Sequence, residues 1–176
     1  KKINLLYQDL KRYSKIILKE KINNLDDIFK YIDRKKDVSR VLFESFNMLP
    51  SLQKAHYDFT SYLPHQFKKK VLTWTYPQIR IDGSINDKFS APLHKDEWIL
   101  DKKKNGLVIW FPINEKGASI YFSKAKNVKK VVKHGYWGIE AIDILELKKV
   151  KIKFGQAIIF DQKKIHKSVQ NENRIS

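Results

Sequence analysis

Two residues with metal-binding side chains lie close together in the stretch PLHKDEW, residues 92–98: His94 and Asp96, with Lys95 between them. On a β-strand, side chains at positions i and i+2 project from the same face, so we expect His94 and Asp96 to point together and Lys95 to point away. An imidazole nitrogen and a carboxylate oxygen on one face form half of a metal site. The alternative is an ordinary polar pair in a loop or at a strand edge, because His-x-Asp triplets also arise by chance.

A second histidine far along the chain could complete this site. Gly155 opens an apolar run that reaches Phe160, a polar turn follows, and His166 begins the next predicted strand. The wide separation from His94 suits two strands on opposite sides of a jelly roll. Arg174 follows His166, and Ser176 lies two residues beyond it, on the same face of any strand. The chain has no cysteine, so histidine and carboxylate are the only strong metal ligands available.

Other polar and aromatic residues are weaker candidates. Gln78 and Arg80 would share one face of a predicted strand and could contact a bound molecule, although a solvent-facing pair fits equally well. His134 precedes a Gly-Tyr-Trp-Gly stretch that we interpret as a loop; it could border a pocket, but a structural role is favoured. Trp98 and Trp110 are interpreted as core or pocket wall, with Trp98 placed to touch a substrate.

The residue pattern divides the chain into a helical region and a strand region. Up to about Leu63, apolar residues recur at helical spacing, and the first predicted helix face is Ile3, Leu6, Leu10, Tyr13 and Ile17. Asn24 is expected to start a helix, Ser51 to cap another, and Pro64 to stop it. From Lys70 onward, short runs rich in β-branched and aromatic residues predict strands. The predicted strands are 71–82, 91–96, 106–113, 118–122, 128–133, 142–146, 149–154, 156–161 and 165–169.

This pattern predicts one domain over residues 1–176: a helical support segment, 1–66, and a β core, 67–176. The fold class we expect is mostly β with N-terminal helices, a double-stranded β-helix (jelly roll, cupin-like) buttressed by those helices. No run of about 18 apolar residues and no signal-peptide pattern occur, so we expect no membrane span and a cytoplasmic protein. The chain does not begin with Met, which is compatible with a fragment of a longer product.

The net charge of +17 would ordinarily suggest nucleic acid as a partner. Of the 36 basic residues, however, only five are Arg and the rest are Lys spread along the chain. Arg is the residue whose planar fork suits phosphates and base edges, so we regard nucleic-acid binding as disfavoured and the charge as solvated surface that could favour an anionic substrate. Phosphate-binding Gly-rich loops and Gly-x-Ser-x-Gly elbows are absent, which argues against nucleotide hydrolysis and serine hydrolase chemistry.

Taken together, the pattern over roughly residues 70–176 resembles the non-haem Fe(II), 2-oxoglutarate-dependent oxygenases, in particular their phytanoyl-CoA dioxygenase-like branch. The resemblance depends on His-x-Asp at residues 94–96, a distal His166 and Arg174 on the last strand. It is supported by the approach at 155–160, by Asn171, and by NGLVIWFPIN at 105–114, which is similar to the family's central strand.

The resemblance implies that His94, Asp96 and His166 hold Fe(II) on one triangular face, leaving places for 2-oxoglutarate and O2. It implies that Arg174 pairs with the distal carboxylate of 2-oxoglutarate and that Ser176 donates a hydrogen bond to it. In such enzymes 2-oxoglutarate is split to succinate and CO2 and a substrate is usually hydroxylated. The carboxylate at position 96 favours a hydroxylase over a halogenase.

The substrate implied is a small organic molecule, with an anionic compound or a carbohydrate from surface-carbohydrate or secondary metabolism as the expected class. Two alternatives stay open: a cupin-like module that binds a small molecule such as a sugar without redox chemistry, and a nucleic-acid demethylase of related fold.

Overall fold

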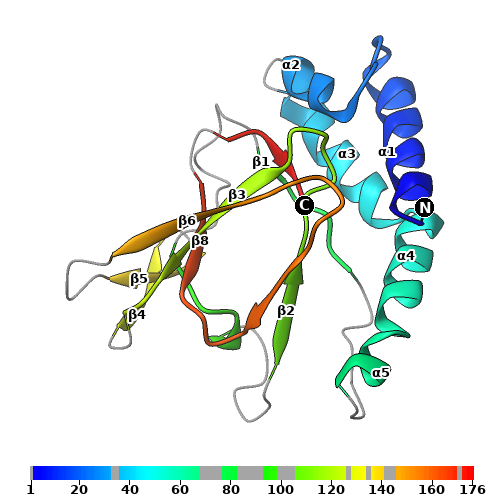
Figure 1. Ribbon diagram of the computed structural model, residues 1–176. Coiled ribbons are helices and arrows are strands. Elements are labelled where there is room, and N and C mark those ends of the chain that lie inside the picture. The colour runs from blue at the N-terminus through cyan, green and yellow to red at the C-terminus, as the bar shows by residue number, and fades with distance from the viewer. Residues whose placement is uncertain are drawn as a thin grey trace. The chain divides into compact units, whose positions relative to one another are not determined.

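The computed structural model describes residues 2–32, 36–67, 77–82, 93–98, 106–125, 128–133, 136–140, 146–169 and 172–176. Within these ranges, helices occupy the first part of the chain and antiparallel strands the later part (Figure 1), which confirms the predicted order of helices and strands. The chain divides into two compact units: a helical unit, residues 1–81 with Ile175, and a strand unit, residues 82–174 with Ser176. The single domain with its 1–66 and 67–176 segments stays a prediction.

The helical unit is built on one buried side of its first helix. Its elements are α1 (Lys2–Leu18), the 3-10 helix η1 (Leu25–Ile28), α2 (Phe29–Ile32), α3 (Lys36–Asn47), α4 (Pro50–Thr60) and α5 (Leu63–Phe67). In α1 the buried positions are Leu6, Leu10, Ser14 and Leu18, each four residues or about one turn from the next, with Leu42 and Phe46 of α3 equally buried. The predicted face of α1 was wrong at Tyr13, which is 38% exposed.

The helix ends follow hydrogen-bond chemistry. Asn24 starts η1 as predicted: its side chain accepts from the Asp27 N–H, while the Asp27 carboxylate accepts from the Asn24 N–H. The predicted cap at Ser51 was wrong, because α4 begins one residue earlier at Pro50, whose missing N–H is harmless in a first turn. The predicted stop at Pro64 was wrong for the same reason, since Pro64 is the second residue of α5.

The described strands differ from the predicted ones in several places. They are β1 (Ile81–Asp82), β2 (Leu107–Trp110), β3 (Ala118–Ser123), β4 (Lys129–Lys133), β5 (Tyr136–Glu140), β6 (Leu147–Ile152), β7 (Ile158–Asp161), β8 (His166–Ser168) and β9 (Arg174–Ile175). The loop expected after His134 is instead the start of β5, because Tyr136–Glu140 pairs with Lys129–Lys133. The predicted strand 142–146 lies almost wholly outside the described residues, as does the first half of 71–82.

The strand pairs are nested. β4 pairs with β5, β3 with β6, β2 with β7, and β1 with β9, so each pair encloses the previous one along the chain. An isolated antiparallel bridge between His94 and His166 fits into the same series, between the β2–β7 pair and the β1–β9 pair. β3 also pairs with β8, a strand that follows the β2–β7 pair in the chain. This pairing links an inner strand of the nested series to a segment outside it. The described strands thus form small antiparallel sheets, and the predicted jelly roll stays a prediction.

Apolar side chains fill the space between two of the sheets. Ile120 and Phe122 of β3 and Ile152 of β6 are buried, and Trp110 of β2 and Phe160 of β7 pack against them. Register places His166 directly opposite Phe122 and Ser168 directly opposite Ile120, so both polar residues share the inward face of the β6–β3–β8 sheet. Polar groups are therefore built into one end of an apolar layer.

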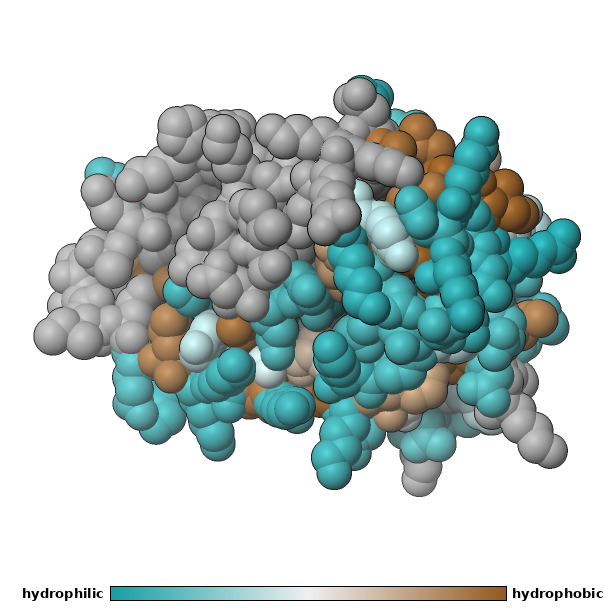
Figure 2. All heavy atoms as spheres, turned by 90° about the horizontal axis from the view of Figure 1, so that it is seen from above, coloured by the Kyte–Doolittle hydropathy of each residue, from teal (hydrophilic) through white to brown (hydrophobic). Residues whose placement is uncertain are grey.

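No described helix is long and apolar enough to cross a membrane. Figure 2 shows hydrophilic side chains over much of the coloured surface of one face, with hydrophobic patches between them.

Candidate metal centre

The two histidines face each other across a pair of backbone hydrogen bonds. The His94 N–H donates to the His166 carbonyl at 2.9 Å, and the His166 N–H donates to the His94 carbonyl at 3.0 Å. Residues that exchange both bonds in an antiparallel pair project their side chains from the same face. The imidazole rings accordingly lie with centroids 4.3 Å apart and are both more than nine-tenths buried.

Asp96 reaches the histidines by a different route from the one predicted. Of the expected strand 91–96, the described residues 93–96 contain only the bridge at His94, and Asp96 begins a 3-10 helix, η3 (Asp96–Trp98). Its carboxylate nonetheless lies between the rings, with Oδ1 at 3.4 Å from His94 Nε2 and Oδ2 at 3.5 Å from His166 Nε2. The prediction that these three side chains converge is confirmed, while the strand alternation that suggested it was wrong for Asp96.

The imidazole of His166 is held by a backbone carbonyl. His166 Nδ1 lies 2.9 Å from the Lys164 carbonyl oxygen, which can only accept, so Nδ1 carries the proton in this contact. In a neutral imidazole this leaves Nε2 without a proton, and Nε2 is the nitrogen that faces Asp96. Ligating histidines in metalloproteins are oriented by this kind of second hydrogen bond.

The spacing of the donors fits one divalent cation. The candidate ligand atoms of His94, Asp96 and His166 lie within 4.8 Å of one another. With bonds of about 2.1 Å, three donors on one face of an octahedron are about 3.0 Å apart, and in a tetrahedron about 3.4 Å. The Asp96–His94 and Asp96–His166 separations of 3.4 and 3.5 Å, measured to different carboxylate oxygens, are close to the tetrahedral value. Two imidazoles and one carboxylate suit several first-row divalent metals, so this is a possible metal site of open metal identity.

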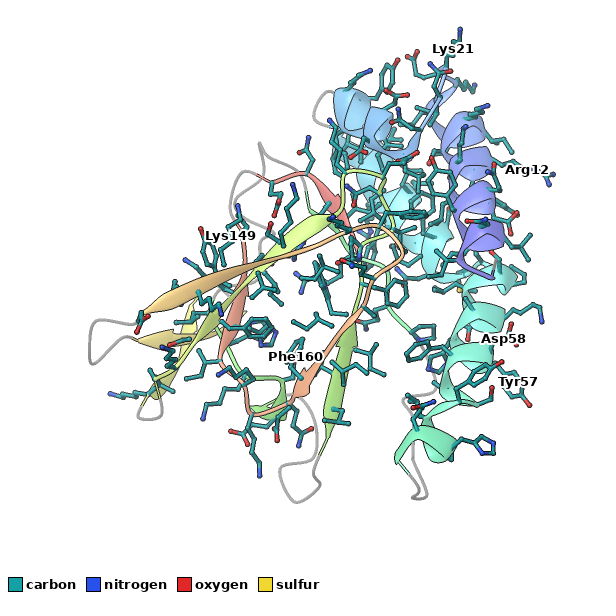
Figure 3. The ribbon with its side chains drawn as sticks, in the orientation of Figure 1. Arg12, Lys21, Tyr57, Asp58, Lys149 and Phe160 are labelled. Atoms are coloured by element: carbon teal, nitrogen blue, oxygen red, sulfur yellow. The ribbon has the colours of Figure 1, made fainter. Side chains whose placement is uncertain are left out.

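Aromatic side chains flank the distal histidine. The Phe160 ring lies edge-on to the His166 ring with centroids 4.8 Å apart. The centroid of the Phe122 ring, on β3, lies 6.2 Å from that of His166. Figure 3 labels Phe160 on β7 and Lys149 on β6. Lys149 is exposed to solvent and lies on the face of the β6–β3–β8 sheet that points away from Phe122. The apolar flank limits water around the imidazole and strengthens electrostatic contacts there.

A buried cation lies on the same inward face. Arg174 of β9 is 3% exposed, its Nη2 donates to Ser168 Oγ, and its guanidinium carbon lies 5.7 Å from the centre of the Trp110 ring. Ser168 is two residues after His166 on β8, so both project inward. Ser176 has a buried Oγ for which the described residues provide no hydrogen-bond partner. A buried donor without a partner is destabilising unless a bound molecule or water satisfies it.

The remaining predicted site residues stay untested by the structure. Gln78 is exposed and Arg80 half-buried, and both precede β1 in the helical unit without strand pairing of their own. His134 and Asn171 lie outside the described residues, as does the side chain of Trp98 at the end of η3. Sequence reasoning missed Ser168 and the Lys164 carbonyl; strand alternation from His166 could have found the first, but no sequence signal marks the second.

No known family model matches this chain, and no curated protein matches its sequence. The function is therefore inferred from the side chains of the site.

Proposed function

We propose that the protein is a non-haem Fe(II), 2-oxoglutarate-dependent oxygenase of the phytanoyl-CoA dioxygenase-like type, which hydroxylates a small organic substrate. The observation that carries this proposal is the convergence of His94, Asp96 and His166 from two distant segments. Two histidines and one carboxylate on one side of a metal leave the other coordination positions free, which this chemistry requires.

The nested strand pairs support a jelly roll as the scaffold. In a double-stranded β-helix, one long antiparallel ribbon folds over so that its strands form two facing sheets. The observed pairs β4–β5, β3–β6 and β2–β7, followed by the His94–His166 bridge, are the pairs that such a ribbon needs. The additional β3–β8 pair is the fold-over contact.

Arg174 supports 2-oxoglutarate as the cosubstrate. Its guanidinium is buried beside one hydroxyl, that of Ser168, and belongs to the same strand end as the unpartnered hydroxyl of Ser176. A buried guanidinium with neighbouring hydroxyl donors suits a carboxylate, because a planar fork binds two oxygens at once. In this proposal Arg174 and Ser176 bind the distal carboxylate and fix the orientation of the cosubstrate.

Each residue then has one task. His94, Asp96 and His166 hold Fe(II), the Lys164 carbonyl keeps the His166 Nε2 free of a proton, and Phe122 and Phe160 limit water at the imidazole. The reaction expected of such a centre is the joint oxidation of 2-oxoglutarate and substrate by O2, which yields succinate, CO2 and a hydroxylated product.

The test is anaerobic titration of the purified chain with Fe(II) and then 2-oxoglutarate, followed by exposure to O2 and measurement of succinate. We expect 2-oxoglutarate to bind only after Fe(II), and succinate to form slowly even without a substrate. Arg174→Lys should weaken 2-oxoglutarate binding at least tenfold while leaving Fe(II) affinity unchanged, because a point charge cannot replace the fork. Metal binding without succinate formation would instead identify a cupin-like binding module, and absence of both would overturn the proposal.

A further inference from the structure

The backbone pairing that fixes the histidines does not fix Asp96. His94 and His166 are locked by their mutual bridge, whereas Asp96 lies in η3, outside any strand pairing. The hydrogen bond that anchors η3 comes from the residue after the ligand: the Glu97 N–H donates to the Gln162 carbonyl at 3.1 Å. Gln162 thus provides one backbone contact through which the described Asp96 segment is tied to the segment that carries His166.

Gln162 belongs to the turn that also orients the His166 ring. The turn follows β7 and is closed by the Lys164 N–H donating to the Asp161 carbonyl at 2.8 Å, with the Asp161 side chain accepting from the Lys163 N–H at 2.7 Å. Its last residue supplies the carbonyl that accepts from His166 Nδ1. One turn therefore holds the carboxylate segment by the carbonyl of Gln162 and the imidazole by the carbonyl of Lys164.

The side chain of Gln162 is packed rather than solvated. It is 1% exposed, and its backbone N–H donates to the Gly106 carbonyl at 3.0 Å. A Cβ at Gly106 would lie 2.1 Å from Gln162 Oε1 and 2.7 Å from Cδ, closer than any tolerated contact. Gly106 does not have a positive φ, so it is glycine for space and not for backbone conformation.

We propose that Gln162 is the positioning residue of the metal centre and that Gly106 is its matched partner: the buried amide, seated in the space left by the missing Cβ, sets the distance between Asp96 and His166. This inference rests on the proposed metal centre, but not on the identity of the metal or on 2-oxoglutarate. Displacing the amide moves the turn, and with it both carbonyls that hold ligand segments. The expected consequence is a change in metal geometry and not only in fold stability.

The experiment uses the full chain and Co(II) alone, read by its visible absorption and by titration calorimetry. Gln162→Ala and Gly106→Ala should each weaken Co(II) binding about tenfold and alter the absorption bands, in the range typical for residues that orient ligands. The double variant should be no worse than Gln162→Ala, because the clash at position 106 disappears with the amide. Gln156→Ala is the matched control, since Gln156 is exposed and its side chain only accepts from the Lys153 N–H.

Thermal unfolding of each metal-free variant separates loss of stability from loss of ligand geometry. Should Gln162→Ala fail to fold, Gln162→Met, which keeps the side-chain volume, and Gly106→Ala give the same test. Folded variants with wild-type Co(II) affinity and spectrum would overturn the positioning role, as would additive effects in the double variant. A wild-type chain that binds Co(II) but never turns over 2-oxoglutarate would overturn the proposed function and leave the positioning role standing; a chain that binds no metal would overturn both.

Discussion

Glu172 accepts hydrogen bonds from Ser119, which lies 53 residues earlier in the sequence, with both of its carboxylate oxygens. Oε2 accepts from the Ser119 N–H at 2.8 Å and Oε1 accepts from the Ser119 hydroxyl at 3.0 Å. Ser119 lies on β3, and Glu172 directly precedes the segment that carries Arg174. The last strand residues are thereby anchored to the central strand of the β6–β3–β8 sheet.

This anchor predicts a selective effect on cosubstrate binding. In Glu172→Gln one acceptor oxygen becomes a donor, so one of the two bonds to Ser119 is lost. We expect 2-oxoglutarate affinity to fall about tenfold, as the loss of roughly one hydrogen bond to a charged group implies, with Co(II) affinity unchanged. Titration calorimetry measures both, with Glu115→Gln in an exposed turn as the control. An equal loss of metal and cosubstrate affinity would contradict the prediction.

Metal binding should stabilise the chain through Asp96. A divalent metal at about 100 times its dissociation constant adds roughly 2.7 kcal/mol, which raises Tm by roughly 5 to 10 °C. Chelation should reverse this shift, and Asp96→Ala should abolish it because two imidazoles alone are a poor site. Differential scanning calorimetry with and without Co(II) checks this. The control, Glu146→Ala, removes an exposed carboxylate paired only with Lys124 and should keep the full shift.

Two glycines with left-handed backbones should respond differently to substitution. Gly117 has φ 69° and a Cβ there would lie 2.4 Å from the Ile152 carbonyl oxygen, whereas Gly155 has φ 80° and nothing within 4 Å. Gly155→Ala should cost about 1 kcal/mol for the backbone strain alone. Gly117→Ala should cost more than that, on the order of 3 kcal/mol, because the clash is with backbone. Urea unfolding gives both values, and equal costs would refute the steric argument.

The first 3-10 helix should give the chain a stability term that depends on pH. The hydrogen bond from the Lys30 ammonium, helped by the N–H groups of Asn24 and Asn23, lowers the pKa of Asp27 against the opposing effect of burial. Because the folded pKa lies below the unfolded value, this stabilisation is present above the unfolded pKa and is lost as the pH falls through the folded pKa. Asp27→Asn should cost about 1 kcal/mol at pH 7.

The pH dependence of that difference is the decisive measurement. The unfolding free energies of the wild type and of Asp27→Asn, measured with urea, should converge as the pH falls below the unfolded pKa of about 4, because the unfolded carboxylate takes up its proton there and the folded one only at lower pH. A difference that is constant from pH 7 to pH 3 would show that the charge of Asp27 contributes nothing.

The sequence predicted the ligands better than it predicted their geometry. The His-x-Asp spacing at His94 and Asp96, together with the resemblance that assigned His166 as the distal ligand, singled out these three residues. Strand alternation failed at Asp96, because a 3-10 turn driven by the bond to the Gln162 carbonyl replaced the strand. That bond depends on a residue distant in sequence, which local patterns cannot reveal.

The helical and strand regions were recognisable because their signals are local in the sequence. The spacing of Leu6 and Leu10 and the β-branched runs after Lys70 are local signals, and both describe the observed elements. β5 was missed because glycines and aromatics at 135–138 read as a loop, while pairing with β4 decides its conformation. The role of Arg80 and Gln78 stays a prediction.

The nested strand pairs also impose an order on folding. The β4–β5 hairpin closes the shortest loop, and each further pair, β3–β6 and then β2–β7, closes a longer one at a small added entropic cost once the inner pair exists. The bridge between the two histidines encloses these pairs along the chain, so we expect the histidines to meet after the inner pairs have formed. During refolding, Co(II) absorption should therefore appear after the amides of the hairpin are protected from hydrogen exchange, so that metal capture marks a chain that has finished closing.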